Sequence, residues 1–376
     1  KFIRNRVTGS GWARKIKIGA LLLYSKRLFP SFTAEMVREK VAGFSKSVAR
    51  PEPDTLPRKR RVFCEIQRTV DEFCSVGDEM VADYTKAFPP SVSACLERSR
   101  ADGGLQRYVR DEVLNELLDD DLTQRLLRVW QLTESQLAAN GPLQSLWERV
   151  LRHLLFAAME ELGLPDEDWR PILVGATGLT EPLKVRIVTK AEWFLQLLTP
   201  IQKAWHGRMR ENPVFQLIGG AKVEDALRGM MTGKGEKVVS GDYSAATDNI
   251  YLTYTRRAAE CMLERTKFQL PPGCPVWAED FLRKLALHSL TEACLDLKGS
   301  EEVMVTRGQM MGHILSFPLL CVINRAASCM AIPRSRFMRI NGDDVVFPAS
   351  KQEYKAWKTC TRCVGLEFSV GKNYYS

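Results

Sequence analysis

The segment that most constrains the fold spans residues 340–347 and reads INGDDVVF. Apolar, β-prone residues stand on both sides of Gly342, Asp343 and Asp344, which predicts a tight β-hairpin whose tip presents two carboxylates. Adjacent like charges repel each other, so a bound cation would stabilise such a tip. Mg²⁺ prefers oxygen ligands and commonly bridges protein carboxylates to phosphates. Taken alone, the same residues could form an ordinary solvated turn, so other segments must decide between the two interpretations.

A second acidic segment precedes the hairpin, at residues 237–249 (KVVSGDYSAATDN). A short apolar strand runs into Asp242, and a turn of small residues then leads to Asp248 and a helical pattern over 250–263. The end of a strand can present Asp242 toward a cleft, in the same region as the hairpin. Asp248 also has a simpler interpretation as the N-cap of the following helix, because Asp is a preferred N-cap residue.

The third segment is a loop followed by a long apolar run, at residues 307–325 (RGQMMGHILSFPLLCVINR). Gly308 and Gly312 frame the loop, and because they lack a Cβ atom the loop can bring its backbone close to a ligand. Ser316 and Asn324 are small hydrogen-bonding residues within the apolar run. Either of them alone could simply bond to the backbone of its own helix.

Taken together and in chain order, these segments resemble motifs A, B and C of viral RNA-dependent RNA polymerases, with A at 237–249, B at 307–325 and C at 340–347. The resemblance is greatest to the narnavirus and ourmia-like (botourmiavirus-like) group. Residues 181–190 (EPLKVRIVTK) resemble the basic F motif of the fingers, and residues 364–374 (VGLEFSVGKNY) resemble motif D. Five motifs in the expected order make this a specific signal.

The composition agrees with a polyanionic partner. The 376 residues are 45% hydrophobic and 26% charged, which is enough for a large globular body of two or three subdomains. The net charge of +9 suits a nucleic acid. Basic clusters stand at residues 4–6, 14–17 and 58–61, and each of them could equally be a solvated surface.

Cysteine usage and hydropathy bear on the compartment. The ten cysteines follow no repeated interval, and the Cys360–Cys363 pair lacks the second pair or the histidines that a zinc site requires. A reduced protein of the host cytoplasm is the prediction, with a mitochondrial site left open. No segment approaches the ~20 apolar residues of a membrane span. Because residue 1 is Lys, we expect the true start to lie upstream.

The resemblance implies an α+β right-hand polymerase, with fingers and a palm whose antiparallel sheet is backed by helices. It assigns residues 1–164 to a helical N-terminal extension and fingers, and residues 165–236 to fingers that carry the F-like motif. Residues 237–376 would form the palm with motifs A–D, interrupted by a finger insertion at 264–306. Since a thumb normally follows the palm in this family, we expect the thumb to be missing from this chain.

The resemblance also implies a two-metal mechanism. Two Mg²⁺ ions, with Mn²⁺ as a substitute, would lower the pKa of a primer 3′-hydroxyl and stabilise the leaving pyrophosphate. Asp242 and Asp343 would be the bridging metal ligands. Asp344 would be ancillary, either as a looser ligand or as a partner of the ligands. Lys372 matches the motif D lysine that is proposed to protonate pyrophosphate, and the alternative is a plain surface lysine.

Nucleotide and RNA contacts follow from the same resemblance. Cations of the F-like motif would neutralise the triphosphate: Lys184, Arg186 and Lys190. Residues of motifs A and B would line the substrate and meet the ribose 2′-hydroxyl, which is both a donor and an acceptor: Asp248, Gly312, Ser316 and Asn324. The step of six residues from Asp242 to Asp248 is one longer than in many RNA-virus enzymes, so the sugar contact of Asp248 stays open.

The predicted function is therefore template-directed transfer of ribonucleotides to an RNA 3′-hydroxyl, replicating a positive-strand viral RNA genome. The partners would be the RNA template, the nascent RNA and ribonucleoside triphosphates, with further viral or host proteins left open. Two alternatives remain. A reverse transcriptase would more often carry a bulky aromatic residue in the first acidic segment and Tyr-x-Asp-Asp in the hairpin. A basic RNA-binding protein without catalysis would use these carboxylates only in structural ion pairs.

Overall fold

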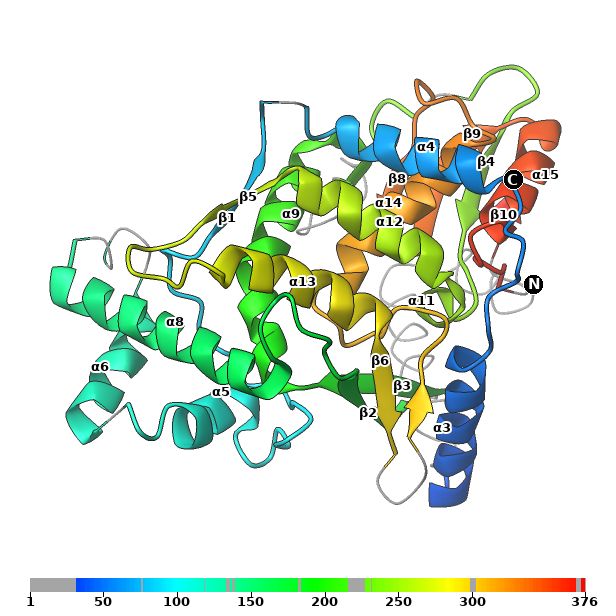
Figure 1. Ribbon diagram of the computed structural model, residues 1–376. Coiled ribbons are helices and arrows are strands. Elements are labelled where there is room, and N and C mark those ends of the chain that lie inside the picture. Colours follow the sequence, from blue (N-terminus) through cyan, green and yellow to red (C-terminus); the bar gives the residue numbers. More distant parts are fainter. Residues whose placement is uncertain are drawn as a thin grey trace, which may run out of the picture.

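The structure is a computed structural model that describes residues 32–75, 77–117, 119–132, 136, 139–181, 184–215, 227–230, 232–297, 302–369 and 373–375. The chain forms a mixed α+β fold, in which groups of helices are interspersed with strands (Figure 1). The strands of the described residues form two four-stranded sheets and one two-stranded sheet. This agrees with the predicted α+β class.

The first four-stranded sheet, called here the β4 sheet, carries the acidic segments and has the order β10-β4-β9-β8. Its strands are all antiparallel to their neighbours: β4 (Lys237–Gly241), β8 (Arg339–Asn341), β9 (Asp344–Ala349) and β10 (Tyr374–Tyr375). In the register of β4 and β9, Gly241 pairs with Val345. The next residues outward, Asp242 and Asp344, therefore lie at the same end of the sheet.

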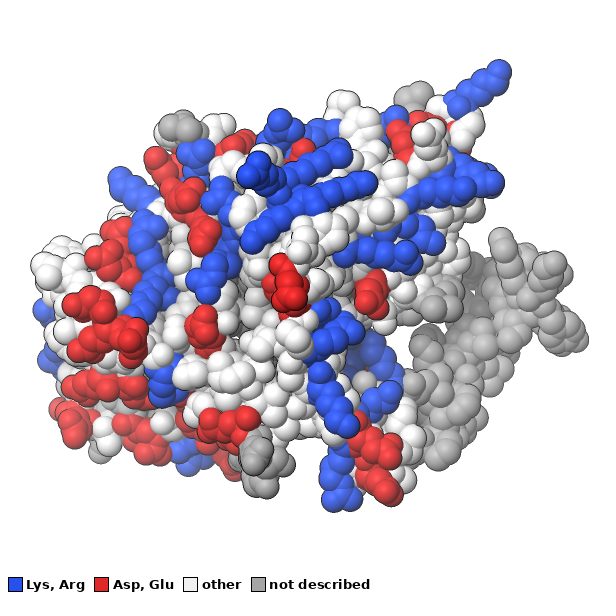
Figure 2. Space-filling model, turned by 45° about the vertical axis from the view of Figure 1, so that its right-hand side comes forward, with Lys and Arg blue, Asp and Glu red and all other residues white. Residues whose placement is uncertain are grey.

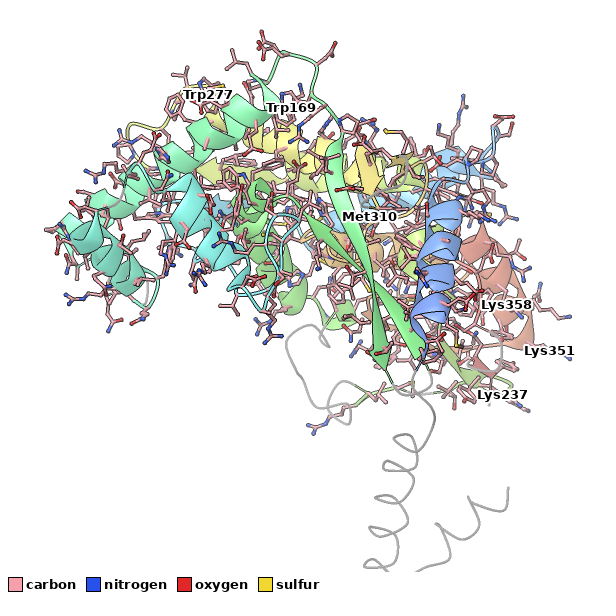
Figure 3. All side chains as sticks on the ribbon, turned by 90° about the horizontal axis from the view of Figure 1, so that it is seen from below. Trp169, Lys237, Trp277, Met310, Lys351 and Lys358 are labelled. Carbon is pink, nitrogen blue, oxygen red and sulfur yellow. The ribbon has the colours of Figure 1, made fainter. Side chains whose placement is uncertain are left out.

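The second four-stranded sheet, the β2 sheet, has the order β3-β2-β6-β7. Its strands are β2 (Ile172–Glu181), β3 (Lys184–Ala191), β6 (Ala293–Asp296) and β7 (Val303–Met304). The long hairpin of β2 and β3 is antiparallel, while β6 joins β2 in parallel. Seen from below in Figure 3, α3 (Ala34–Val48) lies next to this hairpin. Two strands from the predicted insertion 264–306, β6 and β7, thus extend the sheet that carries the F-like motif.

The remaining elements are mostly helical. The two-stranded sheet pairs β1 (Met80–Asp83) in parallel with β5 (Thr266–Gln269). The longer helices are α4 (Lys59–Asp71), α6 (Asp120–Val129), α8 (Gly141–Leu162), α9 (Thr199–Glu211), α12 (Leu252–Glu264), α13 (Ala278–Thr291), α14 (Ser316–Cys329) and α15 (Lys351–Arg362). The short ones are α5 (Gly104–Tyr108), the π-helical turn η2 (Val109–Val113), the 3₁₀ helices η3 (Trp193–Leu198) and η4 (Pro213–Phe215), and α11 (Ala246–Asn249). The bounds of α12 confirm the helix predicted over 250–263.

The centre of the molecule is α14, which is buried on all sides. A helix that is apolar all round belongs in a core, and its neighbours are α4, α9, α12 and α15. Its one fully buried cation, Arg325, is 2% exposed and pairs with Glu72 at 3.1 Å. Buried residues of α4 and α14 belong to the same hydrophobic core. Since α4 lies in the predicted N-terminal region and α14 in the predicted palm, these two regions are packed together.

A close packing contact sets the distance between α15 and the β4 sheet. Trp357 of α15 is fully buried, and its ring lies edge-on to Phe347 of β9 with centroids 5.2 Å apart. It also lies so close to Gly241 that a Cβ atom there would be 2.5 Å from the indole. A side chain at position 241 would therefore displace Trp357, so glycine is required just before Asp242.

The surface is unevenly charged. In Figure 2, Lys and Arg side chains gather over the upper part of the visible face, and Asp and Glu side chains are more frequent at its lower left. None of the described helices is both long enough and apolar enough to cross a membrane. All ten cysteines are free thiols.

Candidate active site

The predicted acidic hairpin is confirmed. Asn341 pairs with Asp344, so the loop that joins β8 to β9 contains only Gly342 and Asp343. Gly342 has a φ of +66°, a backbone conformation that glycine adopts without steric cost. A positive φ at the first loop residue alone is typical of a type II′ hairpin turn. Asp343 therefore lies in the turn itself, and Asp344 is the first residue of β9.

One cavity of about 570 Å³ brings the acidic segments and the F-like hairpin together. Its lining includes six of the predicted site residues: Lys184, Arg186, Asp242, Asp248, Asp343 and Asp344. The rest of the lining comes from Val185, Ile187, residues 243–247, Met311, Leu320 and Ser369. Carboxylates from the β4 sheet thus share a single cavity with cations from β3.

The main chain of Asp242 is held by the segment predicted as motif D. The side chain of Asn373 accepts a hydrogen bond from the Asp242 N–H and donates one to the Asp242 carbonyl, both at 3.0 Å. The N–H of Ser369 donates to the same carbonyl at 3.1 Å. Asn373 was not predicted as a site residue, although it lies within the motif D segment, because its pairing with Asp242 depends on the tertiary fold.

A buried chain of hydrogen bonds joins the two acidic segments below the cavity. The Tyr243 hydroxyl donates to Asn324 Oδ1 at 3.0 Å, and Asn324 Nδ2 donates to the Gly342 carbonyl at 3.0 Å. The Gly342 N–H donates in turn to Cys321 Sγ at 3.1 Å. Burial raises the pKa of Tyr243 well above its ordinary value, so its hydroxyl keeps the proton that it donates. Helix α14 therefore holds the hairpin turn through Cys321 and Asn324.

This arrangement differs from the predicted ribose contacts of Ser316 and Asn324. Asn324 is fully buried, and its amide is used by Tyr243 and Gly342. Ser316 is buried at the start of α14, where its N–H donates to the His313 carbonyl at 3.1 Å. Neither side chain lines the cavity, so the structure does not bring them to the substrate side.

The glycines of the predicted B loop approach the protein's own backbone. A Cβ atom on Gly312 would lie 2.0 Å from the carbonyl oxygen of Thr189 on β3, and the Gly312 N–H donates to Thr189 Oγ1 at 2.8 Å. A Cβ atom on Gly308 would lie 2.8 Å from the carbonyls of Thr247 and Asp248. The loop is therefore fixed between β3 and α11, and its predicted close approach to a ligand stays a prediction.

Asp248 lies in α11 and lines the cavity, so it does not cap the following helix. The N-cap residue of α12 is Tyr251, and that of α11 is Ala245. Burial raises the pKa of the Asp248 carboxyl to about 6, against the opposing hydrogen bond from Thr247 Oγ1 to Asp248 Oδ1 at 3.1 Å. Ala245 has a left-handed backbone with φ +47°, which is uncommon for a residue with a Cβ atom. The turn after Asp242 is therefore strained.

The predicted cations separate into two places. Lys184 and Arg186 line the cavity, and Arg186 Nε pairs with Glu181 Oε1 at 2.7 Å across the hairpin. Lys190 lies farther along β3, opposite Gly175, and lines a different hollow beside Asp296. It is therefore not part of this cavity. Lys372 lies outside the described residues.

The donor set fits a hydrated divalent cation better than a closed protein cage. Among the described residues, no group of three or more His, Cys, Asp or Glu side chains is placed to hold a metal ion. Mg²⁺ commonly binds through one or two carboxylates and completes its octahedron with waters and substrate phosphates. Asp242 and Asp343 can supply those carboxylates at the edge of an open cavity.

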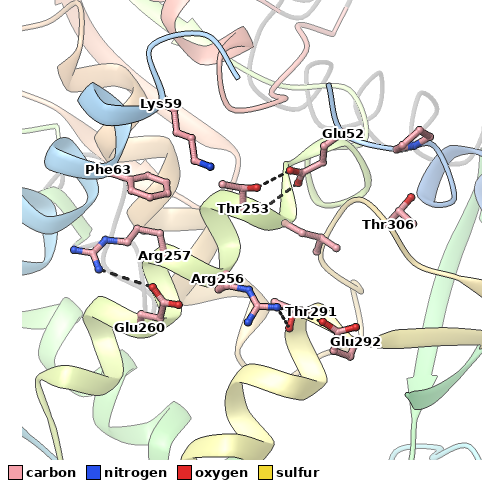
Figure 4. A pocket seen from close by; sticks show the side chains of 12 residues that line it. Glu52, Lys59, Phe63, Thr253, Arg256, Arg257, Glu260, Thr291, Glu292 and Thr306 are labelled. Atoms are coloured by element: carbon pink, nitrogen blue, oxygen red, sulfur yellow. Dashed lines mark hydrogen bonds and ion pairs between the residues drawn. The ribbon is translucent and has the colours of Figure 1, made fainter. Parts of the chain in front are cut away.

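A second hollow of about 540 Å³ lies between α4, α12 and the end of α13 (Figure 4). Its charged side chains largely satisfy one another: Arg256 pairs with Glu292 at 3.2 Å, and Arg257 with Glu260 at 3.8 Å. Glu52 accepts a hydrogen bond from the Thr253 hydroxyl at 2.7 Å. None of the predicted site residues lines this hollow, so the acidic cavity is the better candidate.

Comparison with known proteins agrees with the geometry of the cavity. Over 226 residues the sequence is 28% identical to the RNA-dependent RNA polymerase of Ourmia melon virus (isolate Melon/Iran/VE9). The chain is related to a viral RNA-dependent RNA polymerase. The aligned stretch is 52% of this chain and 25% of that relative, so this chain matches about a quarter of the relative's length. The predicted resemblance to the ourmia-like group is confirmed.

Two further comparisons add less. No model of a known protein family matches the chain. The crystal structure of the RNA-dependent RNA polymerase of a human picorbirnavirus is similar with a TM-score of 0.43 and 16% sequence identity. That likeness covers 56% of this chain and 42% of the other. A likeness of this degree carries no argument about function.

The buried hydrogen-bond chain predicts a specific loss of stability. Y243F removes the donor and leaves Asn324 Oδ1 buried without it, so we expect the free energy of unfolding to fall by about 1–3 kcal/mol in urea titrations. Y254F is a matched control, because the buried Tyr254 hydroxyl has no hydrogen-bond partner among the described residues. That variant should be neutral or slightly stabilised. Equal losses in the two variants would contradict the bridging role of Tyr243.

The raised pKa of Asp248 predicts a pH-dependent effect. An unfolded Asp has a pKa of about 3.9, and the folded carboxyl has one of about 6. The folded chain therefore binds the proton more tightly, and this contribution to stability is lost as pH rises from about 4 to about 6. D248N removes the titration and should stabilise the chain at pH 8 by at most about 3 kcal/mol.

The measurement is urea unfolding in the presence of EDTA at pH 8 and near pH 4.5. The difference between D248N and the parent should shrink toward zero at the lower pH, because the parent carboxyl is then largely protonated in the folded state. D280N, at an exposed position, controls for the loss of one negative charge. A gain in stability for D248N that is the same at both pH values would rule out this explanation.

Proposed function

We propose that the chain carries the catalytic core of an RNA-dependent RNA polymerase, which transfers ribonucleotides to an RNA 3′-hydroxyl under the direction of an RNA template. The observation that carries the proposal is the meeting of Asp242 and Asp343 in one cavity with Lys184 and Arg186. The relationship to a viral polymerase supports it. The setting that the resemblance implies is replication of a positive-strand viral RNA in the host cytoplasm.

In this proposal the chain has the right-hand architecture. The β4 sheet with α12, α14 and α15 would be the palm, and the β2 sheet, with β6 and β7 from the insertion 264–306, would belong to the fingers. The helical region before residue 165 would extend the fingers, and residues 165–236 would carry their basic motif. This assignment is supported by the sheet order, because the two acidic strands and the basic hairpin lie in different sheets.

Asp242 and Asp343 would hold Mg²⁺, with Asp344 as the ancillary carboxylate. When bound, Mg²⁺ would lower the pKa of the attacking 3′-hydroxyl and neutralise charge on the leaving pyrophosphate. The protein's own part is to fix the carboxylates. The two hydrogen bonds of the Asn373 side chain hold the main chain of Asp242, and the Asn324 amide holds the hairpin turn through the Gly342 carbonyl. The backbone that carries each carboxylate is thus held before a nucleotide arrives, which favours electrostatic preorganisation.

Arg186 and Lys184 would neutralise the triphosphate on the other side of the cavity. Arg186 is paired with Glu181, and these side chains are 43% and 46% exposed. An ion pair this exposed contributes little stability, typically below about 1 kcal/mol. Arg186 can therefore exchange Glu181 for a phosphate at small cost, and its planar guanidinium matches phosphate oxygens.

Ribose selection would fall to Asp248, because it is the one among the predicted polar contacts in motifs A and B whose side chain reaches the cavity. A carboxylate accepts a hydrogen bond from a ribose 2′-hydroxyl, and a deoxyribose offers no such donor. This assignment favours ribonucleotides over deoxyribonucleotides. It separates the proposal from the reverse-transcriptase alternative.

The test is primer extension on an RNA template with purified protein, Mg²⁺ and either rNTPs or dNTPs. We expect incorporation of rNTPs, and a loss of at least about 100-fold in D343N because the variant lacks a metal ligand. D280N changes an exposed aspartate in the same way and should keep full activity. RNA binding by D343N should be retained.

Two results would overturn the proposal. Preferential incorporation of dNTPs would identify a reverse transcriptase. Full Mg²⁺-dependent synthesis by D343N would remove the hairpin from the chemistry.

A further inference from the structure

A surface outside the cavity carries cations at regular helical spacing. Lys351, Lys355, Lys358 and Arg362 follow one another along α15 at steps of four, three and four residues, which places them on one face of the helix. Lys358 is partly exposed and the other three are exposed. In Figure 3, Lys351 and Lys358 lie along one edge of the molecule, near Lys237 of β4. These four residues of α15 are called the α15 surface.

The positive charge of this surface is not cancelled by its own helix. The sole acidic residue of α15, Glu353, is used in a capping box, where it accepts a hydrogen bond from the Ser350 N–H at 2.8 Å. It also pairs with Arg336 at 3.4 Å. None of the ion pairs between described residues includes a member of the α15 surface. A partner with closely spaced negative charges would therefore be attracted to it.

Aromatic rings lie between the cations. Tyr354 of α15 stacks on Tyr375 of β10, with ring centroids 4.9 Å apart and planes 14° from parallel. Lys358 Nζ lies 5.4 Å from the centres of the Tyr354 and Phe368 rings, and Lys237 Nζ lies 5.3 Å from that of Tyr375. A basic track with interleaved aromatic side chains is the arrangement by which proteins bind single-stranded nucleic acid without reading its sequence.

The α15 surface is continuous with a second basic segment and leads toward the cavity. Arg58 Nη1 donates to Cys360 Sγ at 3.3 Å, which brings the exposed basic residues 58–61 to the end of α15. Strand β9 leaves the cavity at Asp344 and enters α15 at Lys351, so the helix runs back toward the cavity edge, where Ser369 is part of the lining. Figure 2 shows the dense cluster of Lys and Arg on this side of the molecule.

The length of the surface matches a short piece of a nucleic-acid strand. Eleven residue steps separate Lys351 from Arg362, which at 1.5 Å per residue is about 16 Å. A nucleic-acid strand carries one negative charge per roughly 3.4 Å of helix axis. The four cations can therefore face several successive phosphates.

An anionic membrane surface would attract the same charges, but the apolar part of that interaction is absent. Helices that lie in a membrane interface insert Trp, Phe or Leu side chains beside their basic residues. Among the described residues, none of the exposed large hydrophobic side chains belongs to α15. The cations and aromatic rings together therefore favour a polyanion with stacking bases over a lipid headgroup layer.

We propose that the α15 surface binds single-stranded RNA outside the catalytic cavity, along a track that runs toward it. The inference rests on the proposed function, since it identifies a second contact for the same class of substrate. Phosphates would lie against the four cations and the adjoining basic residues 58–61. The binding is expected to depend strongly on salt and little on base sequence, because phosphate contacts carry no sequence information.

The test measures binding of a fluorescent single-stranded RNA of about 20 nucleotides by anisotropy, without nucleotides or metal, over a series of KCl concentrations. The variant K351Q/K355Q/K358Q/R362Q removes the α15 surface. The matched control R100Q/R128Q/R149Q/K267Q removes four positive charges from exposed positions elsewhere. We expect the α15 variant to bind at least about tenfold more weakly, with the slope of log K against log salt reduced by up to about 3, since each lost contact to a single strand is worth about 0.7.

A conservative variant and a catalytic variant keep the result interpretable. K351R/K355R/K358R retains the charges and should bind as the parent does, while a melting curve shows whether each variant is folded. All binding is measured in parallel in D343N, which keeps the α15 surface and lacks the catalytic carboxylate. Failure of the proposed polymerase would appear as preferential dNTP incorporation or as full synthesis by D343N, both independent of these binding constants.

Two outcomes would overturn the inference. Equal RNA affinity in the α15 variant and its control would mean that this surface does not bind RNA. Unchanged RNA binding together with lost binding to vesicles of phosphatidylserine and phosphatidylcholine would assign the surface to an anionic membrane.

Discussion

The pairing of β4 with β9 is the constraint on which the cavity depends. Because Gly241 lies opposite Val345, the two acidic segments lie at the same end of one sheet. This holds for any conformation of the loops that follow. The fully buried Trp357 of α15 packs against Gly241 and fixes the distance between α15 and the β4 sheet. A shift of one residue in this register would turn every side chain of a strand to the opposite face, and Asp242 would lose its place beside the hairpin.

The same constraint creates an electrostatic problem that the rest of the fold addresses. Three carboxylates near one sheet edge repel each other, and burial has already raised the pKa of a fourth, Asp248, to about 6. The β2–β3 hairpin brings Lys184 and Arg186 to the other wall of the cavity. Packing of Gly312 against β3 at backbone distance holds that hairpin in place. The proposed ligands, a divalent cation and a nucleoside triphosphate, would meet both signs of charge in this cavity.

Features with a local signal could be predicted from the sequence. The hairpin turn, the strand just before Asp242 and the helix after it follow from short patterns of residues, and the structure has all of them. Positions that depend on packing between distant segments could not be predicted. Asn324 is turned away from the cavity because Tyr243 and the Gly342 carbonyl use its amide, and Lys190 lies too far along β3 to share the cavity. The spacing of apolar residues in the sequence does not reveal the position of Asn324 or of Lys190, since both positions depend on how α14 and the β2 sheet pack against the β4 sheet.

Asp242 and Asp343 are proposed to hold Mg²⁺ jointly, between the two acidic segments. Iron-mediated cleavage tests this joint site: Fe²⁺ replaces Mg²⁺ in the presence of nucleotide, and peroxide then produces hydroxyl radicals that cut the nearby backbone. Cleavage is expected at both segments, near residue 242 and near residue 343, with competition by excess Mg²⁺ and loss of both cuts in D343N. Cleavage at only one segment, or at neither, would contradict a cation site shared by Asp242 and Asp343.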